Sequence, residues 1–115
     1  MSRPTHARLP ASGVVLHVRQ EGSGPVVLLL HGFPDSGALW QDVTPPLVAA
    51  GYRVIAPDLR GFGRSEAPAS VGDYALGHSV ADLRALIGRL AGDAPVRVIG
   101  HDWGAVTGWC LALEH

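Results

Sequence analysis

The sequence predicts an α/β fold, in which a mostly parallel sheet is flanked by helices. Three short apolar segments, at residues 26–30, 52–56 and 96–99, are each bounded by turn-forming residues. Unbroken apolar runs of this length are typical of strands that are buried on both faces. Helical patterns separate the three segments, and strands that alternate with helices pair in parallel through right-handed crossovers. The 115 residues suffice for one domain.

Two further strands are expected before the first of these segments, at residues 5–9 and 14–19, and the second has the stronger pattern. Residues 21–25 combine Glu, Gly, Ser and Pro, which is the composition of a turn. Residues 31–37 follow a buried strand and are expected to form a loop. The N-terminal third therefore predicts three strands joined by short connections.

Helices are expected in three places. The first covers residues 38–50 and ends at Gly51. The second covers residues 76–90, after a loop at residues 57–72 that is rich in Gly, Pro and Ser. The third begins just after Asp102. The second helix has one apolar face, formed by residues three or four apart, namely Val80, Leu83, Leu86, Ile87 and Leu90.

Composition narrows the class of function. A net charge of −1 gives no attraction towards nucleic acid or an anionic membrane, so neither partner is expected. The longest apolar run is too short to span a bilayer, and the residues after Met1 do not resemble a signal peptide. The single cysteine, Cys110, cannot form an internal disulfide, which favours the cytoplasm. The six histidines show no metal-ligand spacing, so neither a metal nor a cofactor is expected.

The strongest functional motif is the segment GHDWGA, which follows the strand at residues 96–99 and opens a helix. It has the G-x-S-x-G spacing of a nucleophile elbow, with Asp102 in the place of serine. A tight strand-to-helix turn brings two backbones together, so side chains at Gly100 and Gly104 would collide. The alternative is that Asp102 is only a helix N-cap, a common position for aspartate. An N-cap, however, does not need a glycine two residues away on either side.

An aspartate at this turn favours substitution at saturated carbon. A carboxylate has a reference pKa of about 3.9, so it is ionised at neutral pH and attacks without a base. Its attack leaves an alkyl ester, which water can cleave, whereas serine attacking the same carbon would leave an ether. Asp102 as the nucleophile therefore predicts epoxide opening or loss of halide.

The HGFP loop after the strand at residues 26–30 supplies the second half of the predicted site. An oxyanion hole needs two backbone N–H groups aimed at one point, and the expected donors are those of Phe33 and Trp103. Pro34 has no N–H and is expected to fix the loop, through a cis Phe33–Pro34 bond. The alternative for the loop is an ordinary Gly-Pro turn. Phe33, Pro34 and Trp103 are expected to line the substrate pocket, although Trp103 could equally be a packing aromatic.

Other residues near these motifs are expected to be structural. His31 and Gly32 support the HGFP loop, and Gly100, His101 and Gly104 support the elbow. Asp58 ends a strand and is expected to serve in a turn or a salt bridge rather than as a catalytic acid. The segment RGFGRS has a G-x-G pattern without the following Gly-Lys-Ser/Thr, so it is a turn and not a phosphate loop.

Three segments together resemble the α/β-hydrolase fold family: LLLHGFP at residues 28–34, PDLRGFGRS at 57–65 and GHDWGA at 100–105. Within that family they look like the branch with an aspartate nucleophile, and most like epoxide hydrolases. Haloalkane dehalogenases share the elbow but usually carry Asn or Glu in place of Phe33. Haloacid dehalogenases usually carry Arg in place of Trp103. Both remain alternatives to an epoxide hydrolase.

The resemblance implies that residues 1–115 form the N-terminal part of one α/β-hydrolase domain, truncated after the nucleophile elbow. The implied strand order is 5–9, 14–19, 52–56, 26–30, 96–99, with the second strand antiparallel to its neighbours. In the family, the charge-relay acid, the catalytic histidine and a helical lid with two tyrosines follow the elbow. These positions have no counterpart here, so either the gene is truncated or the remainder is on another chain.

The expected substrate is a small-molecule epoxide or alkyl halide, and the chain is expected to be inactive by itself. A different class of function is also open, namely a non-catalytic remnant or an interaction half that pairs with another chain. Truncation would expose the strand at residues 96–99 as an apolar edge, which predicts self-association.

Overall fold

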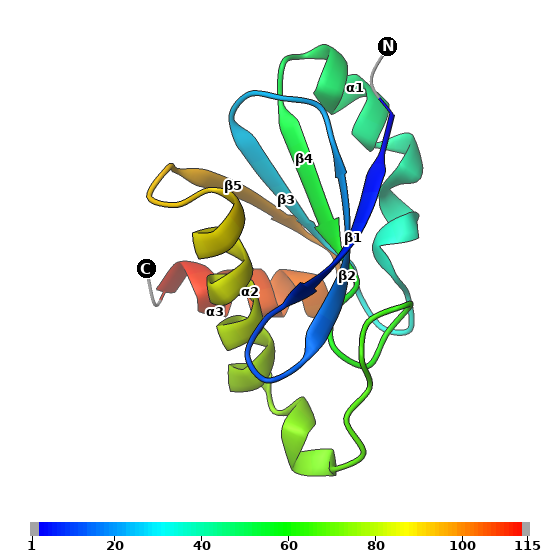
Figure 1. Cartoon of the computed structure of the whole chain (residues 1–115), viewed down its shortest axis with the longest axis vertical. Helices are drawn as coiled ribbons and strands as arrows, with labels where there is room; N and C mark the ends of the chain where they lie inside the picture. Colours follow the sequence, from blue (N-terminus) through cyan, green and yellow to red (C-terminus); the bar gives the residue numbers. More distant parts are fainter. Residues whose placement is uncertain (1–2, 114–115) are drawn as a thin grey trace.

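Five strands form one sheet in the computed structural model, which describes residues 3–113 (Figure 1). The strands are β1 (Thr5–Pro10), β2 (Val15–Glu21), β3 (Val26–Leu30), β4 (Arg53–Pro57) and β5 (Val96–Gly100). Their order across the sheet is β1-β2-β4-β3-β5, which confirms the predicted order. β2 runs antiparallel to both neighbours, as predicted, while β3 is parallel to β4 and to β5.

β3 is buried along its whole length because it contributes to both layers of the core. Leu28 and Leu30 pack into one cluster of buried side chains, whereas Val27 and Leu29 pack into another. Successive side chains of a strand point to opposite faces of the sheet. A run of five apolar residues therefore fills two layers, which explains why this strand lacks an alternating pattern.

Helices cover both faces of the sheet (Figure 1). They are η1 (Gly37–Asp42), α1 (Thr44–Ala49), η2 (Val71–Tyr74), α2 (Leu76–Leu90) and α3 (Trp103–Leu113). α2 and α3 pack on the face that carries Leu28 and Leu30, and η1 and α1 pack on the other. α2 has the predicted bounds, and its residues Val80, Leu83 and Leu86 are buried, as the apolar face predicts.

The predicted single helix over residues 38–50 is wrong, because the chain breaks into η1 and α1 at Val43. Pro45 and Pro46 have no N–H to donate to the preceding turn, and their rings would clash with it. The same residues are tolerated in the first turn of a new helix. The predicted loop over residues 57–72 is also shorter than expected, since η2 begins inside it.

The prediction that residues 96–99 form a strand buried on both faces is wrong for the described chain. Val98 is 36% exposed and Ile99 is 42% exposed. β5 is the last strand in the sheet order, so it pairs with β3 alone, and α1 packs over β4. The geometry instead agrees with the other expectation, an apolar strand at an exposed edge.

Candidate active site

The two loops that carry the predicted site lie side by side, because β3 and β5 pair in parallel up to Leu30 and Gly100. β5 ends at Gly100 and α3 begins at Trp103, so the turn between them is very tight. Asp102 occupies this turn with a φ of 57°, a left-handed conformation that is strained for a residue with a side chain. No other non-glycine residue among those described has a positive φ.

Close packing explains the glycines around Asp102. A Cβ on Gly100 would lie 2.5 Å from the carbonyl oxygen of Gly104 and 2.7 Å from the nitrogen of Ala105. A Cβ on Gly32 would lie 2.8 Å from the carboxylate of Asp102 and 2.9 Å from the carbonyl oxygen of His101. Real Cβ atoms do not approach other atoms so closely, so the elbow and the HGFP loop fit together only with glycine at these positions.

Backbone N–H groups converge on the Asp102 carboxylate. The N–H of Phe33 donates to its Oδ2 at 2.9 Å, although the two residues are 69 positions apart. Hydrogen bonds from the backbone of Phe33 and of Trp103 hold the pKa of Asp102 below its usual value, and the charge of His101 lowers it further. Burial opposes this shift only weakly, because Asp102 is exposed. The carboxylate is therefore ionised at neutral pH.

His31 holds the HGFP loop from within the core, where it is fully buried. The N–H of Leu59 donates to its Nε2 at 2.9 Å, so this nitrogen carries no proton. Its Nδ1 then carries the proton and donates to the carbonyl of Gly32 at 2.8 Å. Both ring nitrogens are engaged, so His31 is not available as a base. The Phe33–Pro34 bond is cis, as the sequence predicts.

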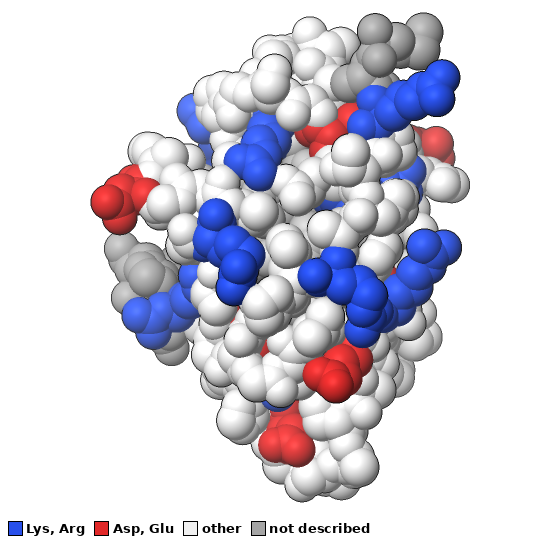
Figure 2. Space-filling model, viewed as in Figure 1, with Lys and Arg blue, Asp and Glu red and all other residues white. Residues whose placement is uncertain are grey.

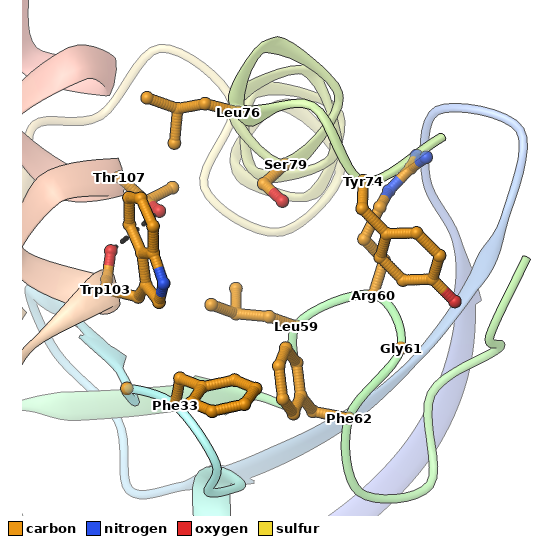
Figure 3. Close-up of a pocket in the computed structure, with 11 residues that line it drawn as sticks. Phe33, Leu59, Arg60, Gly61, Phe62, Tyr74, Leu76, Ser79, Trp103 and Thr107 are labelled. Atoms are coloured by element: carbon orange, nitrogen blue, oxygen red, sulfur yellow. Dashed lines mark hydrogen bonds between the residues drawn. The ribbon is translucent and has the colours of Figure 1, made fainter. Parts of the chain in front are cut away.

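A cavity of about 530 Å³ opens beside the two loops (Figure 3). Its lining residues are Gly32, Phe33, Leu59, Arg60, Gly61, Phe62, Tyr74, Leu76, Ser79, Trp103 and Thr107. In the close-up, the rings of Phe33, Phe62, Tyr74 and Trp103 surround the opening, and Leu59 lies between them (Figure 3). Phe33 and Phe62 meet edge to face, with their centroids 5.7 Å apart. This wall favours a small, largely apolar ligand.

Sequence reasoning identifies two of the side chains in this wall, Phe33 and Trp103, and misses most of the others. Pro34 is exposed and is not among the residues that line the cavity. Thr107 lies one helical turn after Trp103 and donates its hydroxyl to the carbonyl of Trp103 at 2.9 Å, so i, i+4 spacing could have indicated it. Tyr74 is the last residue of η2 and reaches the cavity through tertiary packing, for which the sequence gives no local signal.

The segment RGFGRS is structural, as predicted. Arg60 is buried, and its guanidinium binds Asp82 through two contacts of 2.7 Å. These hydrogen bonds to Asp82 raise the pKa of Arg60, against the opposing effect of burial. The guanidinium also donates to the carbonyls of Ser12 and Asp73, so it ties the turn between β1 and β2, η2 and α2 to the loop. Although Arg60 lines the cavity, its charge is already neutralised.

Neither a metal site nor a membrane-spanning helix occurs between residues 3 and 113. No group of three or more His, Cys, Asp or Glu side chains in this range could hold a metal ion. No helix in the same range is long and apolar enough to cross a membrane.

An aspartate on a strained strand-to-helix turn, facing a backbone donor from the end of a neighbouring parallel strand, has the geometry of the elbow that α/β hydrolases carry. Comparison with known proteins agrees with this class. The family described as "alpha/beta hydrolase fold" matches residues 25–115. The chain therefore belongs to the α/β-hydrolase fold family.

Its relatives within the family include proteins named epoxide hydrolase. It is 45% identical over 105 residues to an epoxide hydrolase of Caballeronia sordidicola, which covers 91% of this chain and 32% of that one. It is 44% identical over 113 residues to epoxide hydrolase 2 of Siraitia grosvenorii, and this match covers 98% of this chain and 35% of the relative. A solved epoxide hydrolase of Vigna radiata superimposes on this chain with a TM-score of 0.92 at 45% identity. The superposition covers 96% of this chain and 34% of the solved one. The chain thus spans about a third of the length of these proteins.

Proposed function

We propose that Asp102 is the nucleophile of an epoxide-opening reaction that passes through an alkyl ester of its own carboxylate. The observation that carries this proposal is the 2.9 Å hydrogen bond from the Phe33 N–H to the carboxylate on its strained turn. A helix N-cap would not need donors from another strand. The similarity to epoxide hydrolases favours an epoxide over an alkyl halide as the substrate.

The first chemical step needs only residues of this chain. One oxygen of Asp102 attacks an epoxide carbon and forms a C–O bond, while the ring C–O bond breaks and its electron pair stays on the ring oxygen. That oxygen then takes a proton from water. The other carboxylate oxygen becomes the ester carbonyl, which the N–H groups of Phe33 and Trp103 would hold. The lowered pKa of Asp102 supplies the ionised form that this attack requires.

The second step, ester hydrolysis, needs a base. Water must attack the ester carbon and give up a proton, and the resulting oxyanion would lie at the two backbone N–H groups. His31 is engaged at both ring nitrogens. His6 and His17 are hydrogen-bonded to each other in a different part of the sheet. Between residues 3 and 113, no side-chain hydrogen bond or ion pair positions the other two histidines, His78 and His101, for this role. We therefore propose that residues 1–115 alone form the ester but do not turn over.

Mass spectrometry after incubation with styrene oxide tests both steps. We expect one adduct per chain, on Asp102, and no release of diol. Asp102→Asn should abolish the adduct, because a neutral amide is a poor nucleophile. Repeated turnover by the 115-residue chain would contradict the inactivity, and adducts on Cys110 and histidines with none on Asp102 would contradict the nucleophile assignment.

A second candidate function, association with another polypeptide, is favoured by an exposed apolar surface on β5 and α3. Its members are Val98 of β5 and Val106, Trp109 and Leu113 of α3. Trp109 is 72% exposed and Leu113 is 82% exposed, which is unusual for side chains of this size. We propose that copies of the chain associate through this surface.

Sedimentation over a range of protein concentrations tests the association. We expect the mass to rise with concentration, and Trp109→Lys to reduce that rise because a charge would then face the partner. Val71→Lys is the matched control, since Val71 is 89% exposed but lies in η2, away from this surface. A monodisperse monomer at all concentrations would refute the association and leave the chemical proposal untouched.

A further inference from the structure

A second cavity, of about 300 Å³, lies beside β1 and β2 and shares no lining residue with the first. It collects an unusual number of basic groups. His6, His17, Arg19 and Arg64 line it together with one carboxylate, that of Asp58. Several basic side chains also lie over β1 and β2 in the view of Figure 2. Nothing in the proposed epoxide chemistry uses this cavity.

A chain of hydrogen bonds orders the histidines. The Nδ1 of His17 lies 2.8 Å from the Oδ2 of Asp58, and its Nε2 lies 2.8 Å from the Nδ1 of His6. A carboxylate only accepts, so Nδ1 of His17 carries a proton, and the Nε2 of the neutral ring is then an acceptor. His6 therefore donates from Nδ1, which leaves its own Nε2 as the nitrogen that can gain a proton. Protonated His6 would present an N–H donor at this position.

The carboxylate in this cavity is already fully engaged. Oδ1 of Asp58 accepts from the N–H of Gly37 at 2.7 Å, and Oδ2 accepts from the N–H of Arg64 at 2.9 Å as well as from His17. Asp58 thus has little capacity left to bind the arginines that line the same space.

One of those arginines has a donor without a partner. Arg19 lies directly across from His6 in the register of β1 and β2. Its Nε is buried and makes no hydrogen bond to any residue between 3 and 113. A buried donor without a partner is destabilising, and the penalty is larger for a charged group. An acceptor placed in the cavity would remove that penalty.

Basic side chains surround His6 in this cavity. The pKa of His6 is lowered, first by desolvation and then by the nearby His17 ring and the charges of Arg19 and Arg64, with Asp58 acting in the opposite direction. On the same face, Arg8 donates to the carbonyl of Arg64 at 2.6 Å and adds a further positive charge. An anion in the cavity would offset this repulsion and favour the protonated form of His6.

We propose that this cavity binds a dianionic oxyanion, either free or as the phosphate group of an organic phosphomonoester, through His6, Arg19 and Arg64. Binding takes up a proton at Nε2 of His6. Affinity therefore rises as the pH falls through the pKa of His6, and it is weakest above that pKa. The cavity is larger than a bare sulfate or phosphate, so it leaves room for an organic group.

Equilibrium dialysis of the 115-residue chain against radiolabelled sulfate, at constant ionic strength in chloride, tests the site at any state of association. Sulfate is the probe because its charge does not change near neutral pH. We expect saturable binding that is about tenfold tighter at pH 5.5 than at pH 8, because protonated His6 adds a charged hydrogen bond to the anion. Absence of saturable binding at the lower pH would overturn the proposal.

Variants locate the site and keep the test decisive. Arg19→Gln should weaken binding about tenfold, as expected for the loss of a charged hydrogen bond. Arg89→Gln removes the same charge from the exposed end of α2 and should leave binding unchanged. His6 is exposed on the edge strand β1, so His6→Asn should fold. This variant should remove the pH dependence of binding even if Arg19→Gln does not fold. Equal weakening by both arginine variants would mean a non-specific charge effect and overturn the proposal.

Competition against bound sulfate distinguishes a site for a free oxyanion from a site for an organic phosphate. Phenyl phosphate that displaces sulfate more tightly than inorganic phosphate does would identify an organic phosphate ligand. Equal displacement by the two would identify a site for the free ion. Failure of both to displace sulfate would contradict a common oxyanion site.

Discussion

Asp58 and Asp102 occupy similar places in the fold and differ in what their carboxylates can do. Both follow strands of the parallel part of the sheet, β4 and β5, at its carboxyl edge. Backbone N–H groups lower the pKa of both. Asp58, however, is only 3% exposed, whereas Asp102 is exposed and lies on a turn with a φ of 57°. The carboxyl edge of the sheet thus holds one carboxylate that stabilises the fold and one that remains accessible for chemistry.

The difference lies in the number and type of partners. Asp58 accepts hydrogen bonds from Gly37, Arg64 and His17, which tie three separate segments together. Asp102 accepts from backbone N–H groups, which stabilise its charge without covering it. The sequence alone predicts that Asp58 is structural and, from the glycines that flank Asp102, that Asp102 is a nucleophile. In the structure, Asp58 is buried and fully paired, whereas Asp102 is exposed on a strained turn.

The largest expected effect is on stability at Asp58. Asp58→Asn places an amide group against donors and leaves buried hydrogen-bond donors unpaired, so it should lower the free energy of unfolding by about 3 kcal/mol. Urea denaturation followed by tryptophan fluorescence measures this. Asp93→Asn, at an exposed carboxylate after α2, is the control and should change stability by less than about 0.5 kcal/mol. An equally small change for Asp58→Asn would contradict the conclusion that Asp58, unlike Asp102, stabilises the fold.

The loss of stability at acid pH tests the same difference between Asp58 and Asp102. Burial would raise the pKa of Asp58, but hydrogen bonds from Arg64, Gly37 and His17 outweigh it, and the folded pKa lies below the unfolded value. The stability that Asp58 contributes is therefore fully present above about pH 4 and is lost as the pH falls through the lowered folded pKa. Asp58→Asn should flatten this part of the stability curve. An equally steep acid transition in the variant would assign the loss to other carboxylates.

At Asp102, we expect a substitution that raises the free energy of unfolding instead of lowering it. Its left-handed conformation is unfavourable for a residue with a Cβ, so Asp102→Gly should raise the free energy of unfolding by about 0.5–1 kcal/mol. Asp102→Asn should change stability very little, because asparagine tolerates this conformation as aspartate does. Destabilisation by glycine would mean that the carboxylate serves the fold, as Asp58 does, and would weaken the case for a nucleophile.

Local signals in the sequence were sufficient for the elbow and for α2. Gly100 and Gly104 mark the close approach of β5 and α3, and the spacing of apolar residues gives the bounds of α2. The break in the first predicted helix also had a local signal, the pair Pro45–Pro46, which the apolar pattern around it obscured.

Long-range contacts had no such signal. The Arg60–Asp82 pair joins residues 22 positions apart, and Tyr74 reaches the cavity wall from the end of η2. The exposure of β5 depends on which strands lie beside it, and the strand's own residues do not determine that. Sequence reasoning therefore predicted the turn that carries Asp102 and its backbone donor Phe33, but could not predict the shape of the space in front of them.

The smallest expected effect, and the most specific one, is the pH dependence of alkylation at Asp102. The attacking group is a carboxylate whose pKa is held below its usual value by the Phe33 and Trp103 N–H groups. The fraction ionised is then already complete at weakly acid pH, so the rate of adduct formation should change less than about twofold between about pH 5 and about pH 8. Mass spectrometry of samples taken at each pH measures this rate. A rise at Asp102 through the range where histidines titrate would mean that a base assists the attack. In that case the availability of the carboxylate would depend on a partner, and the distinction drawn between Asp102 and Asp58 would fail.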